Sequence, residues 1–321
     1  MAIVTNTFLT YSAIGNRESL AETISNISPH ETPFSSSIGR GTAEATLCEW
    51  QTDSLATAAA NAQLQGDDIS SFTAVTPTVR VGNRTMISRK DVVVSGTQDA
   101  VKKAGRGKET AYQVVKRGQE LKRDIEVNLI GVNQAGVTGD STTAPKTASL
   151  QAWVKTNTSI GSGGANPSWS SGVPTPARTD GTQRALTETL LKAVLQATFT
   201  SGGDANILMV GPYNKGVVSG FSGIATRFRD VAAGQQAQIV GGADIYVGDF
   251  GQLKVVPNRF QRERDAFVVD PAMASILTLR PFQVEDLAKT GDASKKMLIT
   301  EYALKVNNEA AFGIVADLAT S

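Results

Sequence analysis

The chain has 321 residues, and 31 Lys and Arg against 30 Asp and Glu give it a formal net charge of +1. Balanced charge argues against a dedicated nucleic-acid-binding protein, because such proteins carry a basic excess. Cys48 is the single cysteine and His30 the single histidine, so no intrachain disulfide and no cysteine- or histidine-based metal site is expected. No apolar stretch approaches the length of about 18 residues that a membrane-spanning helix needs, and we expect no membrane partner.

Residues 1–45 are rich in Ser and Thr and predict an extended N-terminal arm, with one short helix near residues 18–24. Apolar residues recur along this segment, which argues against a purely solvated tail. The apolar residues are Phe8, Tyr11, Ile14, Leu20, Ile24, Ile27 and Phe34.

Residues 46–94 predict a long hairpin. Alternation around Cys48 and Trp50 indicates a first strand, and a Val- and Thr-rich run over 72–94 indicates a second extended arm. An Ala-rich stretch and the acidic pair Asp67-Asp68 separate the two arms. A two-stranded hairpin with few large core residues is marginal alone in water, so it needs another surface to lie on.

Residues 97–133 change to helical periodicity and predict a long helix from about 108 to 131, roughly 36 Å in length. Its expected apolar stripe is Tyr112, Val115, Leu121, Ile125 and Leu129. Basic residues gather on and before this helix: Lys102, Lys103, Arg106, Lys116, Arg117, Lys122 and Arg123. A solvated polar face and a face turned toward a polyanion both explain these charges.

Residues 134–181 are rich in Gly, Ser, Thr and Pro, and such a segment is too long for a plain linker inside a compact domain. It is therefore either functional or disordered. Trp153 and Trp169 lie within it, which argues that the segment packs against something.

Residues 182–290 predict an α/β unit. It begins with a helix over about 182–199, and a final strand follows the unit near 298–306. Short apolar runs within the unit indicate buried strands at 207–210, 245–247, 253–256 and 266–269.

Sequence motifs for catalysis are incomplete. Asp249-Phe250-Gly251 spells a kinase metal-binding triplet, but the histidine-containing catalytic loop is missing, so a hairpin turn explains it better. Gly220-Phe221-Ser222-Gly223-Ile224 lacks the last glycine of a hydrolase elbow, and its base would have to be His30. No phosphate loop is present. We expect no catalytic, cofactor-binding or metal-ligating residues, and no cofactor.

Three groups of residues resemble the major capsid proteins of tailed double-stranded DNA bacteriophages with the HK97-like fold. The first is Glu49-Trp50-Gln51-Thr52-Asp53-Ser54-Leu55 followed by Gly66-Asp67, and the second is Val94-Ser95-Gly96-Thr97 followed by Leu121-Lys122-Arg123-Asp124-Ile125-Glu126. The third is Thr290-Gly291-Asp292 through Glu301-Tyr302-Ala303-Leu304-Lys305-Val306-Asn307-Asn308-Glu309. None is a catalytic signature, and the resemblance lies in scaffold residues over nearly the whole chain.

The resemblance implies an α+β fold with the parts of that family. Residues 1–45 would be the N-terminal arm and 46–94 the extended loop called the E-loop, which would lie on an adjacent subunit. Residues 95–200 would form the peripheral P domain with its spine helix and the excursion at 134–181. Residues 201–292 would form the axial A domain, and 293–321 would return to the P domain.

A structural shell subunit is the function that the resemblance implies, with hexamers and pentamers enclosing packaged double-stranded DNA. Copies of the chain would be its main partners, DNA a weak non-specific one, and portal, scaffolding or decoration proteins further ones. It would be assembled in the cytoplasm of a bacterial host and end in the virion capsid. An encapsulin-like compartment shell and a small-molecule enzyme on an α/β domain are the alternatives.

Two sets of residues are the expected sites. Trp50, Leu55 and Phe72 would carry the E-loop interface, with Trp50 as its main anchor because aromatic residues dominate interface burial. Replacing Trp50 by Ala would then weaken assembly more than folding. The seven basic residues named above would be largely exposed, several of them toward the shell interior.

Overall fold

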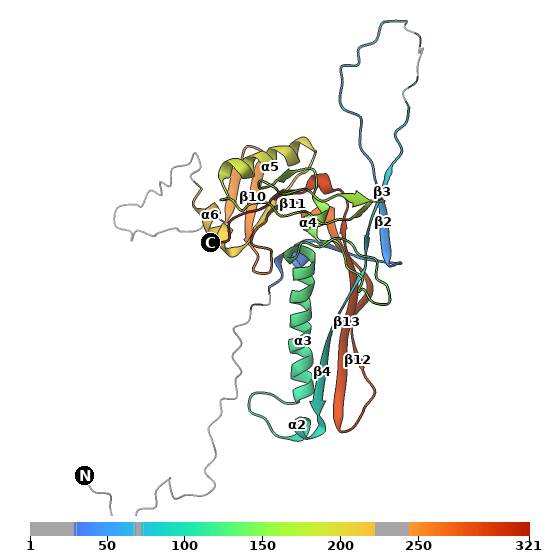
Figure 1. Ribbon diagram of the computed structural model, residues 1–321, viewed down its shortest axis with the longest axis vertical. Coiled ribbons are helices and arrows are strands. Elements are labelled where there is room, and N and C mark those ends of the chain that lie inside the picture. Colours follow the sequence, from blue (N-terminus) through green and yellow to red (C-terminus); the bar gives the residue numbers. More distant parts are fainter. Residues whose placement is uncertain (1–28, 30, 67, 69–71, 73, 222–243) are drawn as a thin grey trace, which may run out of the picture.

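The computed structural model describes residues 29, 31–66, 68, 72, 74–221 and 244–321. A four-stranded sheet and a six-stranded sheet share one core. In Figure 1 the four-stranded sheet and a long helix form the elongated lower part of the molecule, and the six-stranded sheet lies in the body above them.

Strands far apart in the sequence form the four-stranded sheet. Its order is β1 (Gly39–Thr42), β12 (Ala274–Asp286), β13 (Ala293–Val306) and β4 (Met86–Ser95). β13 pairs antiparallel with both neighbours, whereas β1 runs parallel to β12. The β12–β13 register shifts around Pro281, which has no N–H to donate to the ladder.

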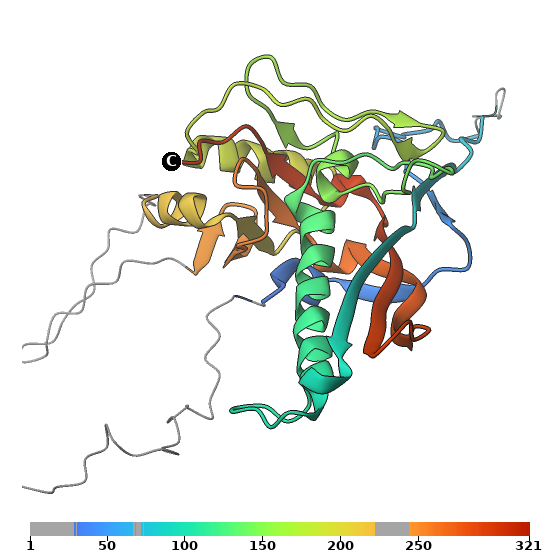
Figure 2. The same cartoon turned by 60° about the horizontal axis from the view of Figure 1, so that its bottom comes forward.

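Helix α3 (Glu109–Glu126) lies along one face of this sheet and continues into a π-helical turn over Val127–Gly131 (Figures 1 and 2). Eighteen residues at 1.5 Å each give α3 a length of about 27 Å. Asp99, in the short helix α2 (Gly96–Ala100), accepts the Thr110 backbone N–H at 3.1 Å. This bond satisfies one of the N–H groups that a helix start leaves without a partner.

The expected helix over 108–131 is confirmed, but one residue of its apolar stripe is wrong. Val115 is exposed, and its neighbour Val114 packs against the buried cluster that contains Leu121. Residues seven apart share a helix face, as 114 and 121 do, whereas the six-residue step from 115 to 121 leaves that face.

The six-stranded sheet is a mixed sheet with helices packed on it. Its order is β5 (Thr158–Ser159), β14 (Gly313–Val315), β11 (Ala266–Val269), β8 (Ile207–Val210), β10 (Gly251–Pro257) and β9 (Ile245–Gly248). Helix α5 (Glu188–Thr200) packs against β14 and β5, and α6 (Pro212–Ser219) packs against β10. The expected strands at 207–210 and 266–269 and the hairpin around Asp249 are confirmed.

The Gly- and Ser-rich excursion is part of the main core and not a solvated loop. Every residue of its helix α4 (Leu150–Trp153) is buried, and Trp153 is among the largest fully buried side chains of the described residues. Short strands β6 (Trp169–Ser170) and β7 (Val173–Pro174) follow in the same excursion. The expectation that the segment packs against something is confirmed, because it packs against both sheets.

Two segments pair with strands of a different domain from the one in which the sequence placed them. Residues 274–286 were expected in the A domain, but β12 pairs with β13 in the four-stranded sheet. β14 was expected to return to the P domain, but it pairs with β11 in the six-stranded sheet. Which sheet a strand belongs to depends on pairing with strands that are distant in sequence, and the order of segments along the chain does not reveal that pairing.

The long hairpin is shorter than the sequence indicated. β2 (Leu47–Thr52) pairs antiparallel with β3 (Val79–Arg84), and residues 53–78 form the connection between them. Residues 86–95 do not belong to the hairpin, because β4 pairs with β13 instead. Of the N-terminal arm, α1 (Pro33–Ser37) and β1 are described, and the helix expected near 18–24 lies outside the described residues.

Candidate assembly surfaces

We call β2 and β3 the hairpin base, and one buried asparagine ties this base to the rest of the chain. Asn83 is fully buried, and its Nδ2 donates to the carbonyls of Leu304 at 2.7 Å and Ala148 at 3.1 Å. Its Oδ1 accepts the backbone N–H of Ala148 at 2.8 Å and of Arg84 at 2.9 Å. A side-chain amide offers two donors and two lone pairs, so Asn83 uses its full capacity.

An aromatic cluster gives the hairpin base a second attachment. Trp50 of β2 stacks on Trp153 with ring centroids 5.4 Å apart, and Trp169 meets Trp153 edge-on at 5.2 Å. The ammonium of Lys155 lies 3.6 Å from the Trp169 ring centroid. Each aromatic pair of this kind contributes about 0.5–1.5 kcal/mol beyond the burial of its surface.

Trp50 therefore packs within its own subunit, where the sequence had placed it at a subunit contact. The ring is partly buried against the main core, which includes Trp153. Leu55 and Phe72, the other two residues expected at that contact, are 98% and 88% exposed. The three residues do not form one surface, because Trp50 lies at the base and the other two in the connection beyond it.

We call residues 53–78 the tip loop, and its apolar side chains have almost no cover from the described chain. Leu64 and Val75 are exposed along with Leu55 and Phe72. In Figure 1 the loop projects away from both sheets, beyond β2 and β3. Several large apolar side chains gathered on one protruding segment indicate an interaction surface more strongly than single exposed ones do.

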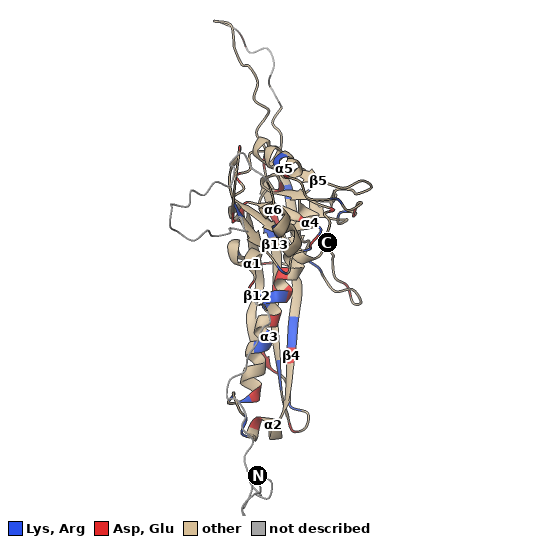
Figure 3. Ribbon diagram, turned by 90° about the vertical axis from the view of Figure 1, so that its left-hand side faces the viewer, with Lys and Arg blue, Asp and Glu red and all other residues tan. Residues whose placement is uncertain are grey.

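The seven basic residues near α3 do not form one exposed face. Lys102, Lys116 and Lys122 are exposed. Four are engaged inside the chain: Arg106 with Glu109, Arg117 with Glu120, Arg123 with the Pro29 carbonyl, and Lys103 with the Val101 carbonyl. Figure 3 shows acidic and basic residues together along α3. These four are intermediate in exposure, and both arginine–glutamate pairs form because their residues are three apart on or just before the helix.

Glu126, the last residue of α3, joins three segments at one buried point. Its carboxylate accepts the backbone N–H groups of Phe34 at 2.7 Å and Ser35 at 2.8 Å, both in α1. Asn258, which follows β10, donates its Nδ2 to the same carboxylate at 2.7 Å. The arm, the long helix and the six-stranded sheet are therefore held together by hydrogen bonds to one charged group.

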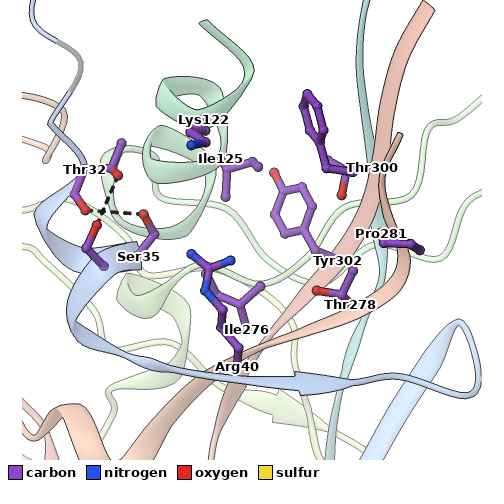
Figure 4. Close-up of a pocket in the computed structure, with 12 residues that line it drawn as sticks. Thr32, Ser35, Arg40, Lys122, Ile125, Ile276, Thr278, Pro281, Thr300 and Tyr302 are labelled. Carbon is purple, nitrogen blue, oxygen red and sulfur yellow. Dashed lines mark hydrogen bonds between the residues drawn. The ribbon is translucent and has the colours of Figure 1, made fainter. Parts of the chain in front are cut away.

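A cavity of about 340 Å³ opens beside α1, between α3 and strands β12 and β13 (Figure 4). We call it the arm pocket. Ile125, Ile276 and Tyr302 give it apolar walls, and Arg40 and Lys122 supply positive charge. Within the described part of the chain, neither cationic side chain has a hydrogen bond or ion pair, and no carboxylate lines the cavity. The arm pocket therefore combines apolar walls with hydroxyl groups from Ser and Thr side chains, and it carries positive charge.

A buried charge cluster attaches the end of the excursion to the C-terminal segment. Asp317 accepts the N–H groups of Gly161 and Gly181 at 2.9 and 2.8 Å and pairs with Arg264 at 3.0 Å. Burial raises the pKa of nearby Asp265 to about 6. Through Asp317, hydrogen bonds and an ion pair join the excursion, Arg264 and the C-terminal segment.

The side chains considered for chemistry are not brought together. Cys48 is buried in β2. Burial is the main cause that raises the pKa of its thiol, and the negative charge of Glu301 raises it further. His30 lies outside the described residues. In the described ranges no group of three His, Cys, Asp or Glu side chains is placed to hold a metal ion. The same ranges contain no helix that is both long and apolar enough to cross a bilayer.

Two of the anchoring residues, Asn83 and Glu126, were missed by sequence reasoning. Asn83 had a detectable signal, because Val79, Val81 and Asn83 alternate along β3 and residues two apart share a face. A polar residue in that series has to be satisfied by hydrogen bonds if the face is buried. Glu126 had no comparable signal, since its partners in α1 and after β10 are distant in sequence.

Comparison with solved structures identifies the fold. The chain superimposes on the capsid asymmetric unit of cyanophage A-1(L) with a TM-score of 0.70 at 14% identity, covering 98% of this chain and 99% of the other. The capsid of a native GTA particle gives 0.62 at 14% identity, with coverages of 97% and 98%. The fold is the HK97-like fold of phage capsid proteins, which confirms the α+β expectation.

Sequence comparison then identifies the family. The family model of the SU10 major capsid protein matches residues 3–319, and the chain belongs to this family. The chain is also 28% identical over 338 residues to the major capsid protein of Escherichia phage Phieco32, covering 96% of each. Its role is that of a structural capsid protein that self-assembles in the virion, as the resemblance implied, and the encapsulin-like and enzyme alternatives find no support.

Proposed function

We propose that this chain forms hexamers and pentamers that tile an icosahedral phage head around double-stranded DNA. The tip loop carries the proposal, because Leu55, Leu64, Phe72 and Val75 expose apolar surface that the described part of their own subunit leaves uncovered. Burying one such side chain fully against a neighbour is worth about 1.5–3 kcal/mol before the cost of ordering the loop. Each contact is therefore weak, and the shell is stable because the contact repeats.

The arrangement of the hairpin supports a mechanical role for its base. Asn83 and Trp50 fix the direction in which the hairpin leaves the body, so the tip loop starts from a defined position. A loop whose two ends are held by paired strands reaches a neighbour with less entropic cost than a free tail does. Nothing in this role requires a chemical step, and we propose that the chain has no enzymatic activity.

Electron microscopy and sedimentation of the purified protein test the shell proposal. We expect capsomers or closed shells of uniform diameter, whereas a small-molecule enzyme would sediment as a small oligomer. A variant in which residues 57–75 are replaced by a short Gly-Ser linker should fold with unchanged far-UV circular dichroism but fail to form shells. Val115→Ser, which removes an exposed apolar side chain outside the loop, is the matched control. Shells of normal size from the linker variant would contradict the proposal.

We propose that two exposed lysines before and on α3, Lys102 and Lys116, face the shell interior and meet DNA phosphates. Such contacts are sequence-independent and weaken as salt rises. In DNA-filled heads both lysines should resist an impermeant acylating reagent and become labelled after the heads are opened. Labelling of both in intact filled heads would place them on the outer surface and contradict this assignment.

A further inference from the structure

The Gly- and Ser-rich excursion contains a small hairpin with a tightly defined turn. β6 and β7 pair antiparallel, and only Ser171 and Gly172 connect them. Both connecting residues have a positive φ, 49° and 79°, as a two-residue turn of type I′ requires. We call residues 169–174 the excursion hairpin. Its turn has a fixed shape, and glycine adopts the second of these conformations without strain.

The turn of the excursion hairpin meets β3 backbone to backbone. The Gly172 carbonyl accepts the N–H of Gly82 at 3.0 Å. A Cβ added at Gly172 would clash with the carbonyl oxygen of Arg80 and lie 3.0 Å from the Cα of Val81. Only glycine therefore fits between the turn and the strand, and the two elements lie too close to slide past each other.

The excursion hairpin is itself held by the body of the subunit. Gly136 donates its N–H to the Pro174 carbonyl at 3.0 Å, and Val173 is buried. Trp169 meets the fully buried Trp153 edge-on at 5.2 Å. The excursion hairpin is therefore a rigid support for β3, because it is packed against the core on the side away from that strand.

This support acts where the hairpin base needs it. Asn83 and Trp50 hold the base at two points, and a ribbon held at two points can still tilt about the line that joins them. The turn adds a third point, and Arg80 lies three residues closer to the tip loop than Asn83 does. Residues 53–64 span at most about 40 Å when extended, so a tilt of about 10° would move their far end by about 7 Å.

We propose that the excursion hairpin sets the angle at which the hairpin base carries the tip loop, and that Gly172 is the positioning residue of this support. In Figure 1 the yellow-green part of the excursion lies beside β3, where the tip loop begins. The inference rests on the proposed shell function. A loop that leaves every subunit at the same angle meets its neighbours in the same way, which favours shells of uniform diameter.

A distance measurement between two spin labels tests the support. The unassembled full-length chain would carry Cys48→Ser, with one label at Val79→Cys on the outer end of β3 and one at Ala193→Cys on α5. Both native side chains are exposed, so the labels disturb little packing. Gly172→Ala should shift or broaden the distance distribution by about 2 Å or more. Its methyl group forces the turn away from β3 and breaks the bond to Gly82, and strand residues are about 3.3 Å apart, so the displacement grows toward the outer end.

Gly163→Ala is the matched control. Gly163 lies in the same excursion with a φ of +78°, but no atom of the described chain lies within 4 Å of a Cβ added there. The control carries the same backbone strain without the contact with β3, and it should leave the distribution unchanged. A role in stability alone would lower the unfolding midpoint and leave the distances of the folded protein unchanged. An unchanged distribution in Gly172→Ala, or an equal change in Gly163→Ala, would overturn the proposal.

Hydrogen exchange of the wild-type chain tests the same contact without a substitution, and it serves equally if Gly172→Ala does not fold. The N–H of Gly82 should exchange at least about a hundredfold more slowly than that of Ala58, an exposed residue of the tip loop, after correction for intrinsic rates. The reason is that exchange at Gly82 requires the excursion hairpin to open. Equal rates at the two positions would show that the support is open most of the time and would reject it.

Assembly measurements connect the support to the shell. Gly172→Ala leaves the sequence of the tip loop intact, yet it should raise the concentration needed for shells about fivefold relative to Gly163→Ala and give shells of varied diameter. Equal assembly of the two variants would show that the angle does not matter and would also overturn the inference. Wild-type protein that forms no shells would instead remove the proposed function, whereas the distance and exchange measurements on the unassembled chain do not depend on shell formation.

Discussion

The hairpin base and the tip loop are continuous in sequence and opposite in character. In the base, Asn83 makes four hydrogen bonds and Trp50 stacks on a fully buried tryptophan. In the tip loop, Leu55 and Phe72 are almost wholly exposed. Both segments contain apolar residues, so composition alone does not separate them.

The difference shows where each segment obtains its stabilising contacts. The base obtains its main contacts within one subunit, because the side chain of Asn83 is fully hydrogen-bonded and the ring of Trp50 stacks on Trp153. The tip loop lacks such contacts in the described chain, and in the proposed shell another subunit would cover its apolar surface. Changes in the base should therefore lower the stability of the subunit, and changes in the tip loop should lower assembly.

Replacing Asn83 should have the largest effect on folding. Asn83→Ala leaves the N–H and carbonyl of Ala148 and the carbonyl of Leu304 buried without a partner, which we expect to lower the free energy of unfolding by about 3–5 kcal/mol. Urea denaturation of the unassembled protein measures it. Asn61→Ala in the tip loop is the control and should change stability little, because the described chain gives this exposed side chain a single hydrogen bond, from Gln63. If Asn83→Ala and Asn61→Ala lowered the free energy of unfolding equally, the hairpin base and the tip loop would not differ in their contribution to folding.

Replacing Trp50 should have the next largest effect on folding. The variant also shows whether Trp50 acts mainly by packing within its own subunit or mainly by contacting another subunit. Trp50→Ala removes the stacking on Trp153 and should destabilise the unassembled subunit by about 2–4 kcal/mol. All three tryptophans belong to this cluster, so their fluorescence reports unfolding of this region. An unchanged unfolding midpoint with impaired assembly would return Trp50 to the subunit contact that the sequence suggested.

Much of the fold was predictable because its signals are local. Helical spacing located α3, and short apolar runs located β8 and β11. Pairing partners were not predictable in the same way. The run over 72–94 has one composition, yet β3 pairs with β2 while β4 pairs with β13, and only the arrangement of distant strands separates them.

The surroundings of the three residues expected at the E-loop interface were predictable only in part, for a physical reason. Exposed Leu55 and Phe72 were correctly placed in a projecting loop, since a polar, Ala-rich segment cannot bury them locally. Trp50 was assigned by residue type alone, and residue type does not tell whether an aromatic ring packs within its own subunit or against another. Trp153, about a hundred residues away, supplies its partner.

The single native thiol, Cys48, allows the accessibility of the hairpin base to be compared with that of the tip loop. Burial raises the pKa of Cys48, so less of it is thiolate at pH 8 than in an exposed cysteine, and the thiolate is the reactive form. Native Cys48 should react with a thiol reagent at least about tenfold more slowly than Phe72→Cys in a Cys48→Ser background. The Cys48 rate should also keep rising between pH 8 and pH 10. Similar rates at both positions would show that the base opens as readily as the loop.

A tip-loop substitution should have the smallest effect on folding and a clear effect on assembly. Leu55 is 98% exposed, so Leu55→Ser removes almost no intrachain contact and should change the free energy of unfolding by no more than about 0.5 kcal/mol. The same change deletes apolar surface that a neighbour would bury, so the protein concentration needed for shells should rise. Val115→Ser, also exposed but on α3, controls for the loss of any exposed apolar group. Should Leu55→Ser destabilise the isolated subunit as Trp50→Ala does, the loop would have a fold of its own, and the division between base and tip loop would fail.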